Sequence, residues 1–126
     1  MPSLVRESKK RNLSAIIISF NPASATAQNT GKVLPPGAVP IGCRSLGGGT
    51  GGTTPIADIG TAADPDGFAA GIDADGIDAN FISGALTGVA LTVPTPIYAN
   101  GRSGDLATGG TCRAVVYYVI KETGGE

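Results

Sequence analysis

The chain has 126 residues, a formal net charge of −1 and 15% charged residues, and small side chains dominate it, with 20 glycines and 9 prolines. This length fits one domain. Few charges and few large apolar side chains predict a protein that completes its burial against other chains. Histidine is absent, which excludes imidazole general-base catalysis, Ser-His-Asp and Cys-His nucleophile systems and His-ligated zinc. We therefore expect a non-enzymatic part of an assembly.

Charge is unevenly distributed along the chain. Residues 1–12 are basic overall, whereas residues 13–126 are acidic overall. This pattern predicts a flexible basic arm over residues 1–12 and a single domain over residues 13–126. The arm is either a solvated terminus or a segment that orders on an acidic neighbouring surface. Its basic side chains, which are too few to indicate nucleic-acid binding, are Arg6, Lys9, Lys10 and Arg11.

From Leu13 onward the sequence has the pattern of short strands separated by turns. The expected strands, which are rich in apolar or β-branched residues, are 13–20, 32–34, 38–46, 53–60, 81–86, 89–93, 97–99 and 112–120. Residues 112–120 alternate with apolar side chains on both faces, which predicts a central strand or one at a subunit contact.

Glycine-rich and polar segments between these strands predict loops. We expect residues 47–52, which are almost all glycine, to form a flexible loop and residues 61–80 to form a long ordered loop. Asn100-Gly101 is a hairpin-turn signal, and residues 103–110 are expected to be irregular.

The absence of helical signals decides the fold class. No stretch of ten residues combines a 3.6-residue apolar period with freedom from Gly and Pro. Pro94 and Pro96 indicate an edge strand, because proline cannot donate to a strand ladder. We therefore predict an all-β fold, and among sandwiches, jelly rolls and small barrels we favour a jelly-roll-like β-sandwich with an extended basic N-terminal arm.

An acidic cluster is the one candidate metal site. Asp73, Asp75 and Asp78 place hard oxygen ligands at short spacing, which suits Ca²⁺. The EF-hand pattern is not matched, because in a count from Asp73 the glycine Gly76 falls at position 4 instead of 6, and position 12 is Gly84 instead of a glutamate. Aspartate also favours turns by accepting hydrogen bonds from its own backbone. Turn formation and calcium binding both remain open.

The two cysteines, Cys43 and Cys112, lie in expected strands. The N-terminal residues lack the apolar stretch of a secretory signal, so we expect buried free thiols in a protein made in a reducing cytoplasm. The longest run of aliphatic side chains, residues 15–18, is far too short to span a bilayer. We expect no membrane partner and no cofactor.

Four segments resemble small structural proteins of tailed bacteriophages. They are residues 33–41 (VLPPGAVPI), 52–68 (GTTPIADIGTAADPDGF), 95–101 (TPIYANG) and 114–120 (AVVYYVI). The likeness covers about residues 31–122, and its motifs are compositional rather than catalytic.

The resemblance implies a capsid decoration (cement) protein with a β-sandwich fold and a homo-oligomeric state, preferably a trimer. It implies the major capsid protein as partner and the exterior of the virion capsid as location, after synthesis in the host cytoplasm. No catalytic residues follow from it. The arm residues Arg6, Lys9, Lys10 and Arg11 are the expected capsid contacts. The alternatives are a tail, neck or fibre appendage module, or a calcium- or carbohydrate-binding β module that uses Asp73, Asp75 and Asp78.

Overall fold

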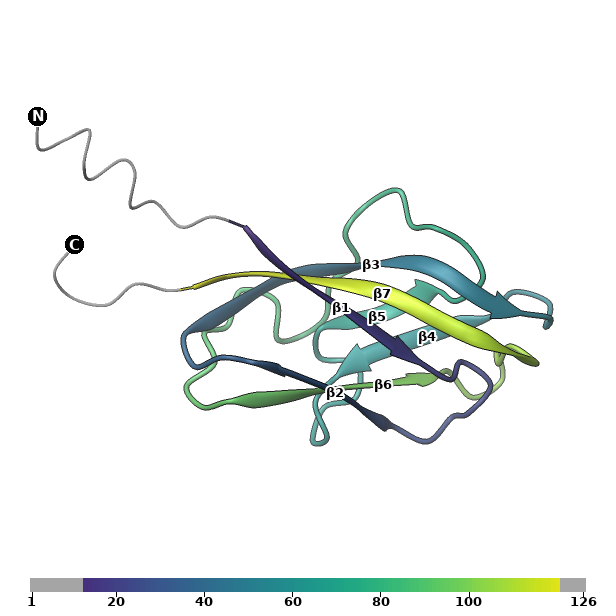
Figure 1. Cartoon of the computed structure of the whole chain (residues 1–126), viewed down its shortest axis with the longest axis horizontal. Coiled ribbons are helices and arrows are strands. Elements are labelled where there is room, and N and C mark those ends of the chain that lie inside the picture. The colour runs from purple at the N-terminus through teal and green to yellow at the C-terminus, as the bar shows by residue number, and fades with distance from the viewer. Residues whose placement is uncertain (1–12, 121–126) are drawn as a thin grey trace, which may run out of the picture.

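The computed structural model describes residues 13–120, and all regular structure in this range is β (Figure 1). The strands are β1 (Ser14–Phe20), β2 (Gln28–Leu34), β3 (Ala38–Thr50), β4 (Ile56–Gly60), β5 (Ala69–Asp73), β6 (Thr95–Gly101) and β7 (Gly109–Ile120). No helix occurs between residues 13 and 120. The all-β prediction is therefore confirmed. The arm over residues 1–12 lies outside the described residues.

The strands form two antiparallel sheets, which lie as two layers in Figure 1. Sheet A has the order β1-β7-β3, and sheet B has the order β2-β6-β4-β5. Every strand contributes a fully or almost fully buried apolar side chain to the cluster between the layers, represented by Ile18, Leu34, Cys43, Ile59, Ile72, Ile97 and Val116. The two sheets therefore share one hydrophobic core. The expected central position of residues 112–120 is confirmed, because β7 lies between β1 and β3.

The strand pairings are nested from the chain ends inward. The first strand β1 pairs with the last strand β7, and β2 pairs with β6. Next inward, β3 meets the segment after β5 through the bridges Leu46↔Ile77 and Cys43↔Ile82. Innermost, β4 pairs with β5. Two further pairings, β3 with β7 and β4 with β6, cross this nested set and complete the two sheets.

Residues 74–94, which we call the closing segment, join the two sheets along one side. On sheet A, Cys43 N donates to Ile82 O (2.9 Å) and Leu91 N donates to Ala38 O (2.8 Å). On sheet B, Ala70 N donates to Ser83 O (3.0 Å). The prediction of strands at 81–86 and 89–93 is wrong, because neighbouring backbone groups of this segment bond to different sheets and cannot form a continuous ladder.

The glycine run is the largest departure from the predicted loops. Residues 47–50 belong to β3, and Gly49 lies opposite Gly110, in a part of β7 expected to be irregular. Gly48 has φ +114°, and a Cβ there would overlap the carbonyl oxygen of Thr111. The glycines therefore allow a close backbone approach in a strand, and the prediction of a flexible loop over 47–52 is wrong for residues 47–50.

Sheet B contains the other corrections. The strand β5 lies inside the predicted loop 61–80. Asn100 and Gly101 lie in β6, opposite Asp58 and Ala57, so they form no hairpin turn. Pro96 is the second residue of β6, which lies between β2 and β4, so the predicted edge position is also wrong. Proline is tolerated in this central strand because it stands near its start.

We expect the Gly48→Ala variant to lose much more stability than the Gly88→Ala variant. Both glycines have positive φ (+114° and +84°), but nothing lies within 4 Å of a Cβ at Gly88. The backbone strain common to both substitutions costs about 1–2 kcal/mol, and the overlap at Gly48 adds roughly 1–3 kcal/mol. Urea denaturation measures both losses. Equal losses would show that β3 and β7 do not approach this closely.

Candidate interaction surfaces and the acidic loop

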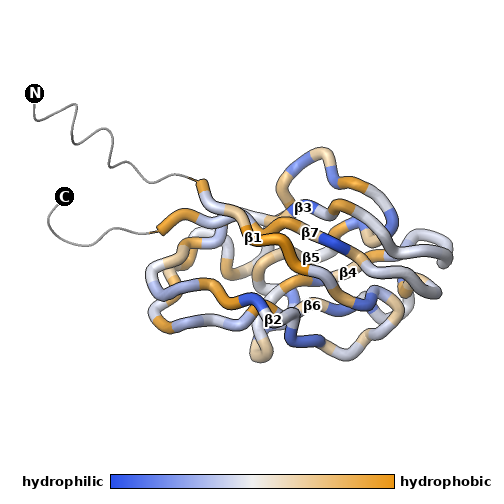
Figure 2. The backbone as a smooth tube through the Cα atoms, in the orientation of Figure 1, coloured by the Kyte–Doolittle hydropathy of each residue, from blue (hydrophilic) through white to orange (hydrophobic). Residues whose placement is uncertain are grey.

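The outer face of sheet A is apolar at its centre. Antiparallel partners share a face, and the register pairs Ala15 with Tyr117, Ile17 with Val115 and Ser19 with Arg113 on the side away from the core. Val115 is only 8% exposed there, whereas Ile17 is 47% exposed. Figure 2 shows the apolar stretch along β1 and its continuation onto β7.

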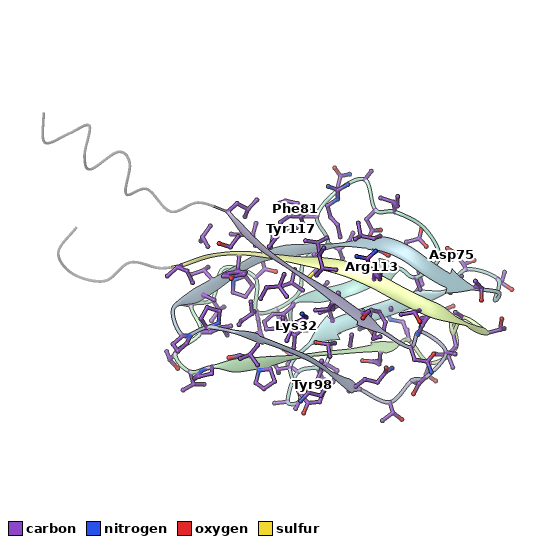
Figure 3. The ribbon with its side chains drawn as sticks, viewed as in Figure 1. Lys32, Asp75, Phe81, Tyr98, Arg113 and Tyr117 are labelled. Atoms are coloured by element: carbon purple, nitrogen blue, oxygen red, sulfur yellow. The ribbon has the colours of Figure 1, made fainter. Side chains whose placement is uncertain are left out.

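The closing segment extends this face with an aromatic pair. Phe81 stacks on Tyr117 with ring centroids 4.7 Å apart (Figure 3). Gly42 lies opposite Tyr117, and a Cβ on it would stand 3.0 Å from the Cβ of Phe81. The missing side chain at Gly42 therefore makes room for the Phe81 ring.

We call Leu13, Ile17, Phe81, Val115 and Tyr117 the apolar face. Three of its members are large and exposed: Leu13 (52%), Ile17 (47%) and Phe81 (45%). Contiguous exposed apolar side chains rimmed by polar ones mark sites of protein interaction. This face is therefore a candidate contact surface.

The predicted contact residues Arg6, Lys9, Lys10 and Arg11 lie outside the described residues. The described chain begins at Leu13, which belongs to the apolar face. It ends at Ile120, opposite Ala38 on the same sheet. Basic residues 1–12 are therefore attached directly at the border of the apolar face.

The predicted acidic cluster is brought together in the turn after β5. The Asp78 carboxylate accepts hydrogen bonds from Ser45 N (2.9 Å) and Asp73 N (3.4 Å), and the Asp73 carboxylate accepts one from Asp75 N (3.2 Å). A side-chain hydrogen bond to Asp73 raises the pKa of Asp75. The carboxylates thus fasten the loop to β3 through backbone donors, the turn role that aspartate favours.

A metal role for these residues has no further support in the geometry. Across residues 13–120, no group of three or more His, Cys, Asp or Glu side chains is arranged to hold a metal ion. The Asp78 and Asp73 carboxylates already accept backbone N–H groups. Calcium binding by Asp73, Asp75 and Asp78 stays a prediction.

An ion pair in sheet B was not predicted from the sequence. Arg102 Nη2 donates to Asp58 Oδ1 at 2.6 Å, and Arg102 Nε donates to Asp58 Oδ2 at 3.3 Å. Gly71 N also donates to Asp58 Oδ1 (2.9 Å), and the hydrogen bond to Asp58 raises the pKa of Arg102. This pair ties β4 to β5 and to the end of β6. The available signal was an aspartate in the middle of an apolar strand, Ile56–Gly60.

The two cysteines are free and fully buried, which confirms the prediction of buried free thiols. Cys43 lies opposite Val116 in the β3–β7 ladder, and Cys112 lies opposite Phe20 in the β1–β7 ladder. Burial raises the pKa of Cys43 to about 12 and the pKa of Cys112 to about 11. Such thiols stay neutral and unreactive near neutral pH.

No protein-family model and no curated protein matches this sequence. The resemblance to structural proteins of tailed bacteriophages therefore stays a prediction. In the part of the chain that the structure describes, no helix is long and apolar enough to cross a membrane.

The turn role of the acidic cluster predicts that calcium leaves the thermal midpoint unchanged, because the Asp73 and Asp78 carboxylates then serve backbone donors alone. A ligand that binds only the folded state raises the midpoint by mass action. Thermal melts in about 1 mM Ca²⁺ and in EDTA test this. A midpoint raised by Ca²⁺, and no longer raised in the Asp75→Asn variant, would establish the calcium site instead.

We expect the two thiols to make stability fall at alkaline pH. Their folded-state pKa values are raised from the ordinary 9.0, so their contribution is fully present below about pH 9 and is lost as the pH rises toward 11–12. Urea denaturation at about pH 8 and about pH 10 measures the change. The Cys43→Ala/Cys112→Ala variant should lose less stability between these two pH values. An identical loss in both proteins would contradict the assignment.

Proposed function

We propose that the chain is a non-enzymatic virion protein: a capsid decoration protein that binds the outer surface of a bacteriophage shell and stabilises it as a homo-oligomer, preferably a trimer. The observation that carries this proposal is the apolar face of sheet A, with the basic residues 1–12 attached at its border. Its proposed partner is the major capsid protein, and its proposed location is the capsid exterior.

The strand connectivity supports this function through a finer description of the fold. We propose that the two sheets form a jelly-roll β-sandwich in which the closing segment stands in place of an eighth strand beside β3. The nested pairing, β1 with β7 and β2 with β6, is the supporting feature. Jelly rolls consist of two sheets built from Greek keys and occur in viral capsid domains. This support is an analogy between folds.

The apolar face and the arm would bind a shell together. Burial of Leu13 and Phe81 against capsid subunits would supply apolar contact area. The arm would order on an acidic patch of the shell, as basic segments do when they fold on binding. Several weak contacts made by a homo-oligomer add up by multivalency, and binding to the assembled shell stabilises it by mass action.

Co-sedimentation with undecorated shells of the phage that encodes the chain tests the proposal. We expect the full-length protein to saturate the shells at hundreds of copies and to raise their melting temperature. The Lys9→Glu/Lys10→Glu and Phe81→Asp variants should each bind roughly tenfold more weakly or worse, because one removes arm charge and the other places charge on the apolar face.

Matched controls separate these surfaces from general effects of charge. Lys32 and Val33 are exposed on β2 of the opposite sheet, so the Lys32→Glu and Val33→Asp variants should bind like the original protein. A protein that does not co-sediment with shells would overturn the proposal. Binding at tens of copies, confined to a vertex or tail, would favour the appendage alternative.

A further inference from the structure

Within residues 13–120, the strand β1 is an unprotected sheet edge. Among the described strands it pairs only with β7, through seven consecutive residue pairs without a register shift, and it stands at the end of the strand order of sheet A. Its sequence, SAIIISF, contains no charged residue, no glycine and no proline. Such an edge presents a row of unpaired backbone N–H and C=O groups to which another strand can add.

The other three sheet edges carry features that prevent strand addition. The edge of β3 is covered by the closing segment, whose Ile82 exchanges backbone hydrogen bonds of 2.8 and 2.9 Å with Cys43. The edge of β5 is engaged by Ser83, which accepts from Ala70 N. The edge strand β2 is interrupted by a register shift between Asn29 and Val33 and exposes Lys32. Bulges, covering segments and lysines are the usual means of edge protection.

We propose that β1 is a self-association strand, on which β1 of a second copy adds antiparallel across a two-fold axis. The sequence of β1 is nearly symmetric about Ile17. With Ile17 opposite Ile17 of the second copy, Ile16 lies opposite Ile18 and Ala15 lies opposite Ser19. Antiparallel partners share a face, so core-facing side chains meet core-facing ones and outer side chains meet outer ones.

This pairing makes one continuous sheet from two copies of sheet A. On its outer face the order across the axis is Val115, Ile17, Ile17 and Val115, because Ile17 already pairs with Val115 within each copy. The exposed half of Ile17 is thereby covered by an identical β-branched side chain. No charge stands in either strand to oppose the contact, and the interface is isologous, as two-fold contacts require.

The self-association goes beyond the proposed function and does not depend on it. A two-fold contact joins copies in pairs, so a protein that also forms trimers would have its trimers linked through β1. The self-association and the proposed binding to capsids are tested independently, because self-association is measured on the protein alone. A protein that pairs but does not bind shells would contradict the proposed function and would still support this contact.

Sedimentation velocity of the full-length protein, together with the Ile17→Lys variant and the Val33→Lys control, tests the contact. Ile17 and Val33 are equally exposed, at 47% each, but Val33 lies on β2 of sheet B. We expect dimers, or hexamers if trimers also form, and Ile17→Lys should halve the mass by setting two like charges opposite each other. Val33→Lys should leave the mass unchanged.

A mixture of two charge variants tests the register itself. We expect Ile17→Lys and Ile17→Glu to stay unpaired separately and to pair when mixed, because opposite charges then face each other across the axis. Circular dichroism checks that each variant keeps its β structure. Should a variant unfold, hydrogen exchange of the original protein decides, since pairing protects β1 amides more at high protein concentration. Monomers or isolated trimers, an unchanged mass for Ile17→Lys, or protection independent of concentration would overturn the proposal.

Discussion

The pairing of β1 with β7 is the interaction on which the rest of the fold depends. It joins Ser14 to Tyr118, nearly the two ends of the described chain, and β7 then holds β3 on its other side. Closing so long a loop costs chain entropy before any contact within it contributes. Folds dominated by such distant pairings form slowly. The nested pairs inside this one, from β2 with β6 to β4 with β5, share its dependence on distant partners.

Small side chains determine how the two layers come together. The composition suggested a chain that is short of large apolar groups, and the core indeed relies on alanines and cysteines beside Phe68 and a few aliphatic residues. Glycines compensate by letting backbones approach: a Cβ at Gly49 would stand 2.7 Å from the carbonyl oxygen of Ala74. The same smallness leaves apolar side chains such as Ile17 and Phe81 partly uncovered. The small side chains of this sequence therefore account both for the close packing of the core and for the apolar area that stays exposed.

The sequence predicted the strands whose side chains carry a clear pattern. β1 and the alternating half of β7 are rich in β-branched residues, and both were located to within a few residues. β5 was missed because its residues, AAGID, have neither alternation nor bulk, and it becomes a strand only through pairing with β4. The strand character of residues 47–50 was missed for a related reason, since glycine indicates a loop unless a close partner requires it.

The same limit applies to the candidate surfaces: features made by neighbouring residues could be predicted, and features made by distant residues could not. The acidic cluster was visible as a local motif, and its turn role followed from spacing that aspartate commonly adopts. The pair of Asp58 with Arg102 joins residues 44 positions apart, so no local pattern could indicate it. The apolar face was predicted only in part: the alternation of residues 112–120 indicated apolar side chains on both faces, but Phe81 reaches Tyr117 only through the closing segment.

The register of sheet A places the two ends of the described chain side by side, since Ser14 lies opposite Tyr118. Chains with adjacent ends tolerate circular permutation, in which the old ends are linked and new ones are opened in an exposed turn. The turn of Arg102 to Asp105 between β6 and β7 is such a place, with Gly104 in open space. The same geometry makes the two ends of the described chain equivalent as attachment points, because a peptide joined directly to Leu13 or to Ile120 would leave the molecule at the same end of sheet A.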